Sequence, residues 1–200
     1  MRWLALLVAA SCCTACVKPV VLSAAIQPGV SVADRSSEKA GVVCSPSLLG
    51  HVERARPSAL AGYATAYEFE LGEPLCNALF KSVEASYRAA QRATTPYHEG
   101  QYGRVIQFDL QNSSLSIVPQ AKGSTRVAYT LSVVVERYGR DLRLMSRNVV
   151  TGNGLVDCKK LTDRVVKEAA EAALQQVADD ASSLLVARLD GPRVPATRAR

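Results

Sequence analysis

The chain has 200 residues, of which 48% are hydrophobic and 21% charged, and its formal net charge is +6. This balance is typical of a folded globular chain of one domain and excludes a disordered one. The positive charge is dispersed, with a local excess only in the segment GPRVPATRAR at 191–200. We therefore expect no nucleic-acid partner, and we expect 191–200 to be a disordered basic tail.

Residues 1–16 read MRWLALLVAASCCTAC. Arg2 precedes an apolar run at 3–10, and small or polar residues follow, which is the layout of a secretory signal. The apolar run is too short to cross a bilayer as a stable helix, so removal is favoured over a transmembrane anchor. The small residues before a cysteine resemble the lipobox of bacterial lipoproteins, in which the signal is cut before a cysteine that then carries a diacylglycerol.

That resemblance implies lipidation of Cys16, with 1–15 as the signal peptide. Cys13 stands where the lipobox usually has Leu, and Cys12 remains the alternative lipidation site. A zinc site is disfavoured, because the three clustered cysteines lack the second half-site that structural zinc needs. Val17, rather than Asp, follows Cys16, which in this family implies the outer membrane. We expect the mature protein to be lipid-anchored there and to face the periplasm.

Disulfides are permitted on that side of the cytoplasmic membrane. Cys44, Cys76 and Cys158 remain in the mature chain, so one disulfide plus a free thiol and three buried thiols both stay open. Cys76 falls on the apolar face of a predicted helix, which favours a packed sulfur over a reactive one.

The segment 16–40 mixes Pro, Gly, Ser and charges without a steady period, so we expect a flexible tether there. A brief strand is predicted within 40–48. The segment 62–71 alternates, with Tyr67 and Phe69 on one face and Glu68 and Glu70 on the other, which predicts a half-buried strand. Three- and four-residue spacing of apolar residues predicts an amphipathic helix over 72–90.

The C-terminal half reads as strands followed by one long helix. Strands are predicted at 104–110 and 114–119, and 125–138 pairs with 142–150 as a hairpin that TGNG at 151–154 ends. A helix is predicted over 161–188 with an apolar stripe made mostly of alanine, which lets it lie close against a sheet. The order predicts an α+β domain at 41–190: a two-layer sandwich of a mainly antiparallel sheet of four to five strands, with two helices packed on one face.

Candidate catalytic residues are scattered. His51 and His98 lie in predicted loops without a nearby cluster of ligands, and Glu68 and Glu70 share the wet face of a strand. No nucleophile elbow or phosphate loop is present. We therefore expect no enzyme, no metal and no cofactor.

The wet face of the predicted sheet and the predicted loop 94–103 are the candidate contacts for a protein partner. The loop offers Tyr97 and Tyr102, with Arg104 just beyond it. Aromatic residues and Arg are frequent interface anchors. The alternative is a loop that packs on its own domain.

Three segments carry a resemblance in pattern and order: YEFELGEPLCNALFKSV, RVAYTLSVVVERYGRDLRLMSRNVV and VVKEAAEAALQQVADDASSLL. Together they resemble small bacterial envelope lipoproteins, which include the YajG-like family and the lipoprotein partner of the lipopolysaccharide-transport barrel. The resemblance implies a non-enzymatic accessory protein that binds a protein partner in an envelope complex. The alternative is a periplasmic carrier or sensor of a small apolar ligand or lipid.

Overall fold

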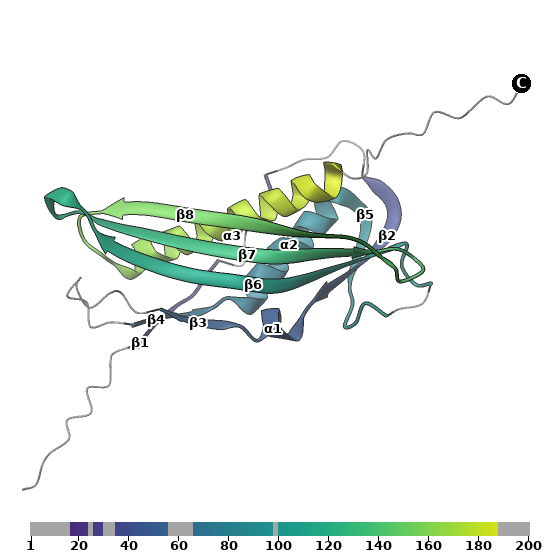
Figure 1. Ribbon diagram of the computed structural model, residues 1–200, viewed down its shortest axis with the longest axis horizontal. Coiled ribbons are helices and arrows are strands. Elements are labelled where there is room, and N and C mark those ends of the chain that lie inside the picture. Colours follow the sequence, from purple (N-terminus) through teal and green to yellow (C-terminus); the bar gives the residue numbers. More distant parts are fainter. Residues whose placement is uncertain (1–16, 24–25, 30–34, 56–65, 98–99, 188–200) are drawn as a thin grey trace, which may run out of the picture.

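The computed structural model describes residues 17–23, 26–29, 35–55, 66–97 and 100–187 (Figure 1). The strands are β1 (Val17–Val20), β2 (Ser36–Cys44), β3 (Val52–Ala55), β4 (Ala66–Glu70), β5 (Tyr87–Arg92), β6 (Arg104–Pro119), β7 (Thr125–Tyr138) and β8 (Leu144–Cys158). The helices are α1 (Pro46–Leu49), α2 (Gly72–Ser86) and α3 (Asp163–Ala187), and a short 3-10 turn, η2 (Ala121–Gly123), joins β6 to β7.

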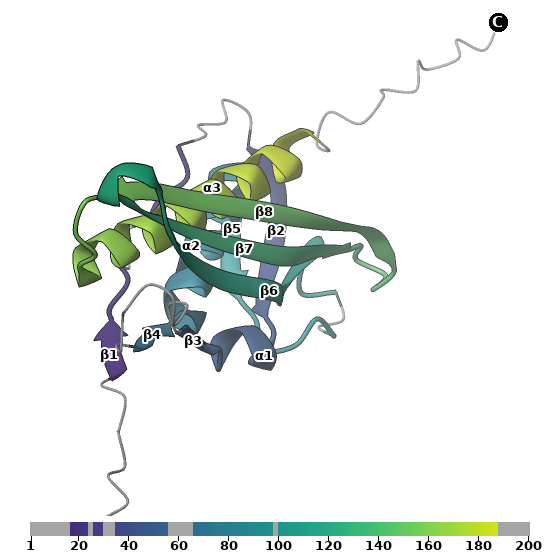
Figure 2. The same cartoon turned by 60° about the vertical axis from the view of Figure 1, so that its left-hand side comes forward.

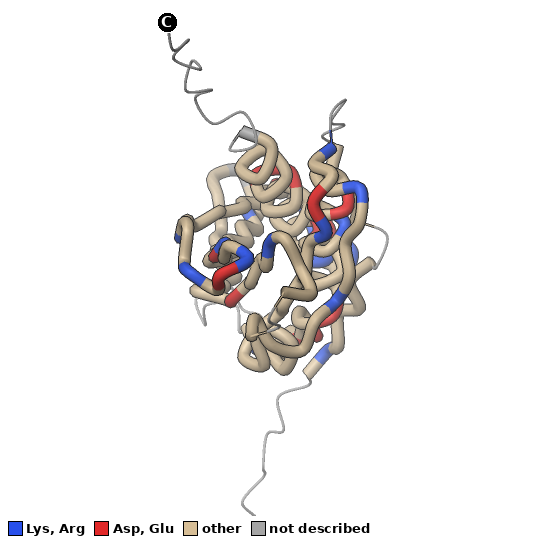
Figure 3. The backbone as a smooth tube through the Cα atoms, turned by 90° about the vertical axis from the view of Figure 1, so that its right-hand side faces the viewer, with Lys and Arg blue, Asp and Glu red and all other residues tan. Residues whose placement is uncertain are grey.

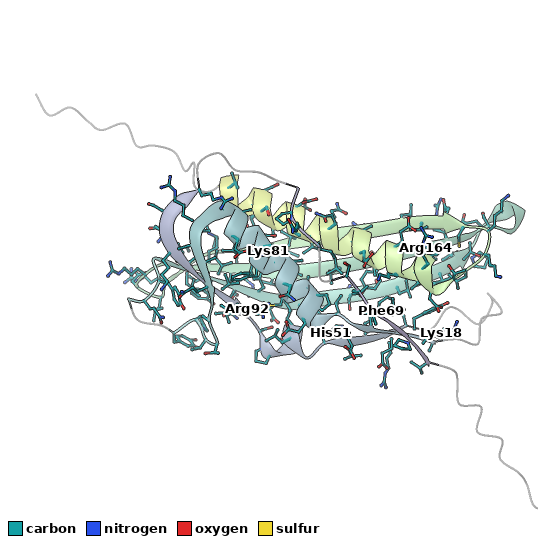
Figure 4. The ribbon with its side chains drawn as sticks, turned by 180° about the vertical axis from the view of Figure 1, so that it is seen from behind. Lys18, His51, Phe69, Lys81, Arg92 and Arg164 are labelled. Atoms are coloured by element: carbon teal, nitrogen blue, oxygen red, sulfur yellow. A yellow bond between two sulfur atoms is a disulfide. The ribbon has the colours of Figure 1, made fainter. Side chains whose placement is uncertain are left out.

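The strands form two sheets. The large sheet has the order β5-β2-β6-β7-β8, and the small sheet has the order β1-β4-β3. The long strands β6, β7 and β8 are antiparallel, whereas β2 is parallel to both of its neighbours and β1 is parallel to β4. Helices α2 and α3 cover one face of the large sheet, which we call the inner face (Figures 1 and 4). The predicted α+β sandwich is confirmed, and the small sheet is an addition to it.

The core lies between the inner face, the two long helices and the small sheet. Alternate residues of β7 are fully buried on this face, as their period of two predicts: Val127, Tyr129, Leu131, Val133 and Val135. The stripe of α3 that meets them is also fully buried and rich in alanine: Val166, Ala169, Ala170, Ala173, Leu174, Val177, Ala178 and Ala181. The small side chains let α3 approach the sheet closely, as the sequence indicates.

Much of the described part of the predicted tether at 16–40 packs on the domain. Val20, Leu22 and Ile26 are buried in the main core, and β2 already begins at Ser36. The backbone N–H of Ser23 donates to a carboxylate oxygen of Glu171 on α3 at 2.7 Å. The segment thus packs on the domain, because its apolar residues fill the core while α3 accepts its backbone hydrogen bonds.

Three predicted boundaries also differ. Helix α2 ends at Ser86, and 87–92 form β5, which pairs with β2. The strands predicted at 104–110 and 114–119 are one strand, β6, with an irregularity in register between Leu110 and Asn112. Strand β8 continues through 151–154 to Cys158. The expected strand residues 62–65 and the basic tail lie outside the described residues.

Helix α1 is held to β6 by a cluster of hydroxyl groups around Asp109. The Ser45 hydroxyl donates to Asp109 Oδ1 at 2.5 Å and the Ser47 hydroxyl at 2.7 Å, while Ser45 Oγ also accepts from the Leu48 N–H at 3.1 Å. Partial burial raises the pKa of Asp109. The hydrogen bonds from Ser45, Ser47 and the Leu110 backbone N–H, with the charge of Arg147, together hold the pKa below its usual range.

Asp109 is expected to make folding stability depend on acid. Because its pKa is lower in the folded chain than in the unfolded chain, its contribution is present above about pH 4 and is lost as the pH falls through the folded pKa. Unfolding in urea at a series of acidic pH values should therefore show a shallower pH dependence for Asp109→Asn than for the wild type. Equal slopes would contradict this role of Asp109.

Candidate interaction surface

The face of the large sheet opposite α2 and α3 carries no helix in the described part of the chain (Figure 1). We call the part of it formed by β6, β7 and β8 the outer surface. Its side chains alternate with the core residues, so Thr130, Ser132 and Val134 on β7 belong to it. Across the pairing, Asn153, Thr151 and Val149 of β8 lie beside these three residues.

Large apolar side chains are exposed on the outer surface. Val118 of β6 is 45% exposed, and on β8 Met145 is 54%, Val149 is 51% and Leu155 is 59% exposed. Strand β8 is also the edge of the large sheet, so its far side pairs with no other strand of the described chain. A long edge strand with exposed apolar residues is a common place for a partner to bind.

Polar pairs separate these apolar side chains. Arg126 makes two hydrogen bonds of 2.8 Å to the carboxylate of Asp157 on the next strand, and the hydroxyls of Ser132 and Thr151 lie 2.9 Å apart. Basic and acidic positions are interspersed along the backbone when the molecule is seen from its end (Figure 3). The surface is thus mixed in polarity, as non-obligate protein interfaces are.

Tyr138 and Glu136 lie at the end of the outer surface nearest the 94–103 loop. The Tyr138 hydroxyl donates to Glu136 Oε2 at 2.7 Å, and Arg147 lies 3.5 Å from the other oxygen of that carboxylate. Burial, followed by the hydrogen bond to Glu136 and its charge, raises the pKa of Tyr138 to about 12. The hydroxyl therefore stays protonated and remains a donor at neutral pH.

The structure separates the three predicted contact residues. Tyr97 is 75% exposed, whereas Tyr102 is only 5% exposed and packs with Val43 and Val105 in a small second core. Arg104 pairs with Glu38 at 3.1 Å. Of the three, Tyr97 is the most exposed, and Tyr102 packs on its own domain.

Tyr102 is expected to stabilise the fold, and Tyr97 is not. The Tyr102 ring fills the space that a Cβ on Gly41 would occupy, and the Lys39 ammonium lies 5.2 Å from its centre. Tyr102→Ala should therefore lower the free energy of unfolding by about 2 kcal/mol or more, and Tyr97→Ala by less than about 0.5 kcal/mol. Denaturant unfolding of the two variants measures this. Similar losses in both would contradict the assignment.

The other sequence candidates do not gather into a reactive site. His51 Nε2 lies 3.1 Å from the Ser113 hydroxyl and 3.8 Å from Glu53, and His98 lies outside the described residues. Glu68 pairs with Arg54 at 2.6 Å on the small sheet, while Glu70 is exposed. Within the described ranges, no group of three His, Cys, Asp or Glu side chains is placed to hold a metal ion.

The structure also resolves the choice among the three mature cysteines. Cys44 at the end of β2 and Cys76 in α2 form a disulfide, and Cys158 is a half-buried free thiol. Burial and the neighbouring Asp157 raise the pKa of Cys158, so its reactive thiolate is disfavoured. Cys12 and Cys16 lie outside the described residues.

The wet face of the sheet is among the contacts expected from the sequence, but the residues of the outer surface are not, although a signal for them is present. Val149 and Leu155 alternate with inward-facing residues of β8, which marks apolar side chains on the solvent side of a strand. Because the glycines at 152 and 154 indicate the end of a strand, the predicted strand stops at 150, before Leu155. None of the helices in the described part of the chain is long and apolar enough to cross a membrane.

Comparison with known proteins places the fold. No family model and no curated protein matches the chain. Among solved structures, the crystal structure of protein XCC0632 from Xanthomonas campestris, described with the family DUF330, has a TM-score of 0.56 at 14% identity. The match covers 87% of this chain and 98% of that one. A minor lipoprotein from Acinetobacter baumannii gives a TM-score of 0.47 at 9% identity, over 78% of this chain and 96% of that one. The chain thus shares its fold with the Xanthomonas protein.

Proposed function

We propose that the mature chain is a non-enzymatic lipoprotein, anchored in the outer membrane through Cys16, that serves as an accessory partner of an envelope protein complex. The observation that carries the partner role is the outer surface, where Val118, Met145, Val149 and Leu155 are exposed on a face that no helix of the described residues covers. Exposed apolar groups set among polar pairs favour a contact with another protein.

The anchor itself is supported by the sequence. An Arg, a short apolar run and small residues lead up to the cysteines of 1–16, and these are the parts of a lipoprotein signal in their usual order. The periplasmic side of this proposal agrees with the Cys44–Cys76 disulfide, because disulfides persist in oxidising compartments.

A carrier of a small apolar ligand is the second candidate. It would be favoured by a closed apolar cavity between the sheet and the helices. Leu131 and Val133 of the sheet and Leu174 and Val177 of α3 are fully buried against that space. Two apolar pockets, one lined by Leu22 and one lined by Cys76, open at the surface. This packing favours the partner role.

The anchor is tested by the intact mass of the mature protein purified from membranes of a Gram-negative host. We expect a diacylglycerol-sized gain in mass that Cys16→Ala abolishes and Cys12→Ala retains. Loss in Cys12→Ala alone would move the anchor to Cys12. A cleaved chain without added mass would contradict the lipoprotein proposal.

The partner role is tested by a photo-reactive amino acid placed at Val149 or Leu155, with Arg164 of α3 as the matched exposed position on the helical side. We expect a discrete cross-linked product with an envelope protein from the two β8 positions and none from Arg164. In a chain that carries the photo-reactive group at Leu155, Val149→Asp should reduce that product. The same products from all three positions would contradict a specific surface.

A further inference from the structure

Apart from Tyr97, the exposed large apolar side chains of the described residues fall into two groups. One group lies on the outer surface and the adjoining hairpin. The other lies around the small sheet: Val17 at 47%, Val21 at 76%, Leu49 at 39% and Val52 at 45% exposure. We call these four residues the small-sheet patch. Figures 1 and 2 show β1, β3, β4 and α1 along one side of the molecule, with β7 and β8 on the far side.

The pairing of the small sheet explains why the patch faces away from the core. Val20 lies beside Phe69, which is fully buried, so Val17 and Val21 point to the opposite side. Val52 lies across from Glu70 on that same outward side. Leu49 adds to it from α1, directly before β3.

A pocket of about 330 Å³ opens within the patch. Val21, Leu49 and Val52 line it together with Val20 and Leu22. The carboxylates of Glu68, Glu70 and Glu73 also line it, and two of them are paired: Glu68 with Arg54 at 2.6 Å and Glu73 with Arg92 at 3.5 Å. A lining that combines apolar and charged side chains suits a partner whose interior is hydrocarbon and whose surface is polar.

The position of the proposed lipid anchor indicates what lies against the small-sheet patch. The inference rests on the proposed lipidation, which would put the lipid on the residue directly before Val17, itself a patch residue at the start of β1. Consecutive Cα atoms are about 3.8 Å apart, so no tether separates the lipid from the patch. Even an anchor at Cys12 would leave only four residues, 13–16, which span at most about 14 Å.

We infer that the small-sheet patch rests on the lipid bilayer that holds the anchor, with acyl chains of the membrane entering the pocket between β1, β3 and α1. The domain then lies directly on the membrane surface instead of being held away from it. In this orientation the far side of the molecule, with β7 and β8, points to the periplasm and leaves the outer surface open to a partner (Figure 2).

The sequence allows single tryptophan residues to serve as fluorescent reporters without background. Its single tryptophan is Trp3, within the predicted signal peptide, so the mature chain has none. Single reporters can therefore be placed as Val21→Trp and Val52→Trp in the patch, with Val149→Trp on β8 as the matched control. All three replace valines that are about half exposed or more, so the fold should tolerate them.

Each lipidated protein is reconstituted in phosphatidylcholine vesicles with or without bromine atoms on the acyl chains. We expect brominated lipid to quench Val21→Trp and Val52→Trp at least about twofold more than Val149→Trp, because patch residues would lie at the boundary between headgroups and acyl chains. Iodide in the aqueous phase should show the opposite order. Matching far-UV circular dichroism spectra confirm that the variants are folded.

The two proposals fail in different ways. A diacylglycerol mass together with equal quenching at all three positions would overturn only the membrane contact. A mature mass without diacylglycerol would overturn the anchor and, with it, the membrane contact that rests on it.

Discussion

Replacing Cys76 with alanine is expected to lower the free energy of unfolding by about 3.5 kcal/mol. The Cys44–Cys76 disulfide closes a loop with a sequence separation of 32 residues, and this closure limits the conformations of the unfolded chain. Cys76 is also 2% exposed and packs within α2, so its removal adds the loss of a buried sulfur. The bond joins the end of β2 to α2, which ties the large sheet to one of its covering helices.

Urea unfolding of the oxidised protein measures this effect, and Cys158→Ala is the matched control. Cys158 is a half-exposed free thiol, so its replacement should change the free energy of unfolding by less than about 0.5 kcal/mol. Treatment of the wild type with a thiol reductant should reproduce most of the loss seen in Cys76→Ala. Equal stabilities of Cys76→Ala and Cys158→Ala would contradict the stabilising role of the disulfide.

Local periodicity predicted the parts of the fold that depend on one element at a time. Alternation over 125–138 predicted β7 with the correct bounds, and the spacing over 72–90 predicted α2 up to its C-terminal end. At that end Tyr87 belongs to the apolar stripe in sequence, but it begins β5. A parallel strand at the sheet edge is a long-range pairing with β2, and no pattern within 87–92 encodes it.

The candidate site depended on contacts that lie far apart in the sequence. The sequence predicts Tyr102 as an interface anchor. In the structure its ring lies where a side chain at Gly41 of β2 would be, so the glycine makes room for it in the domain. The expected tether failed for a similar reason. Val20 and Leu22 look like a short apolar run in a polar segment, and only the pairing of β1 with β4 and the packing on α3 give them a place in the core.

The prediction that TGNG at 151–154 ends a strand was wrong, and the structure gives the physical reason. Glycine serves turns because it adopts positive φ, but it also allows two backbones to come close. Here neither Gly152 nor Gly154 has a positive φ, and both lie within β8 under α3. The same contact explains why the stripe of α3 is made of alanine.

Gly154→Ala is therefore expected to lower the free energy of unfolding by about 3 kcal/mol. A Cβ at this position would lie 1.7 Å from the carbonyl oxygen of Ala169 in α3, and one at Gly152 would lie 2.0 Å from that of Ala173. Both obstacles are backbone atoms, so no side chain can turn aside to relieve the overlap. The helix must move away from β8, and the buried contacts between α3 and the sheet are lost together.

Gly50→Ala is the matched control, because Gly50 has a φ of −85° and its Cβ would meet its nearest neighbour, Pro46 O, at 3.3 Å. Urea unfolding should place this control within about 1 kcal/mol of the wild type. A further test uses Ala169→Gly in the Gly154→Ala chain: it removes a side chain but leaves the obstructing carbonyl, so it should not restore stability. Rescue by that change, or equal effects of Gly154→Ala and Gly50→Ala, would contradict a contact between the two backbones.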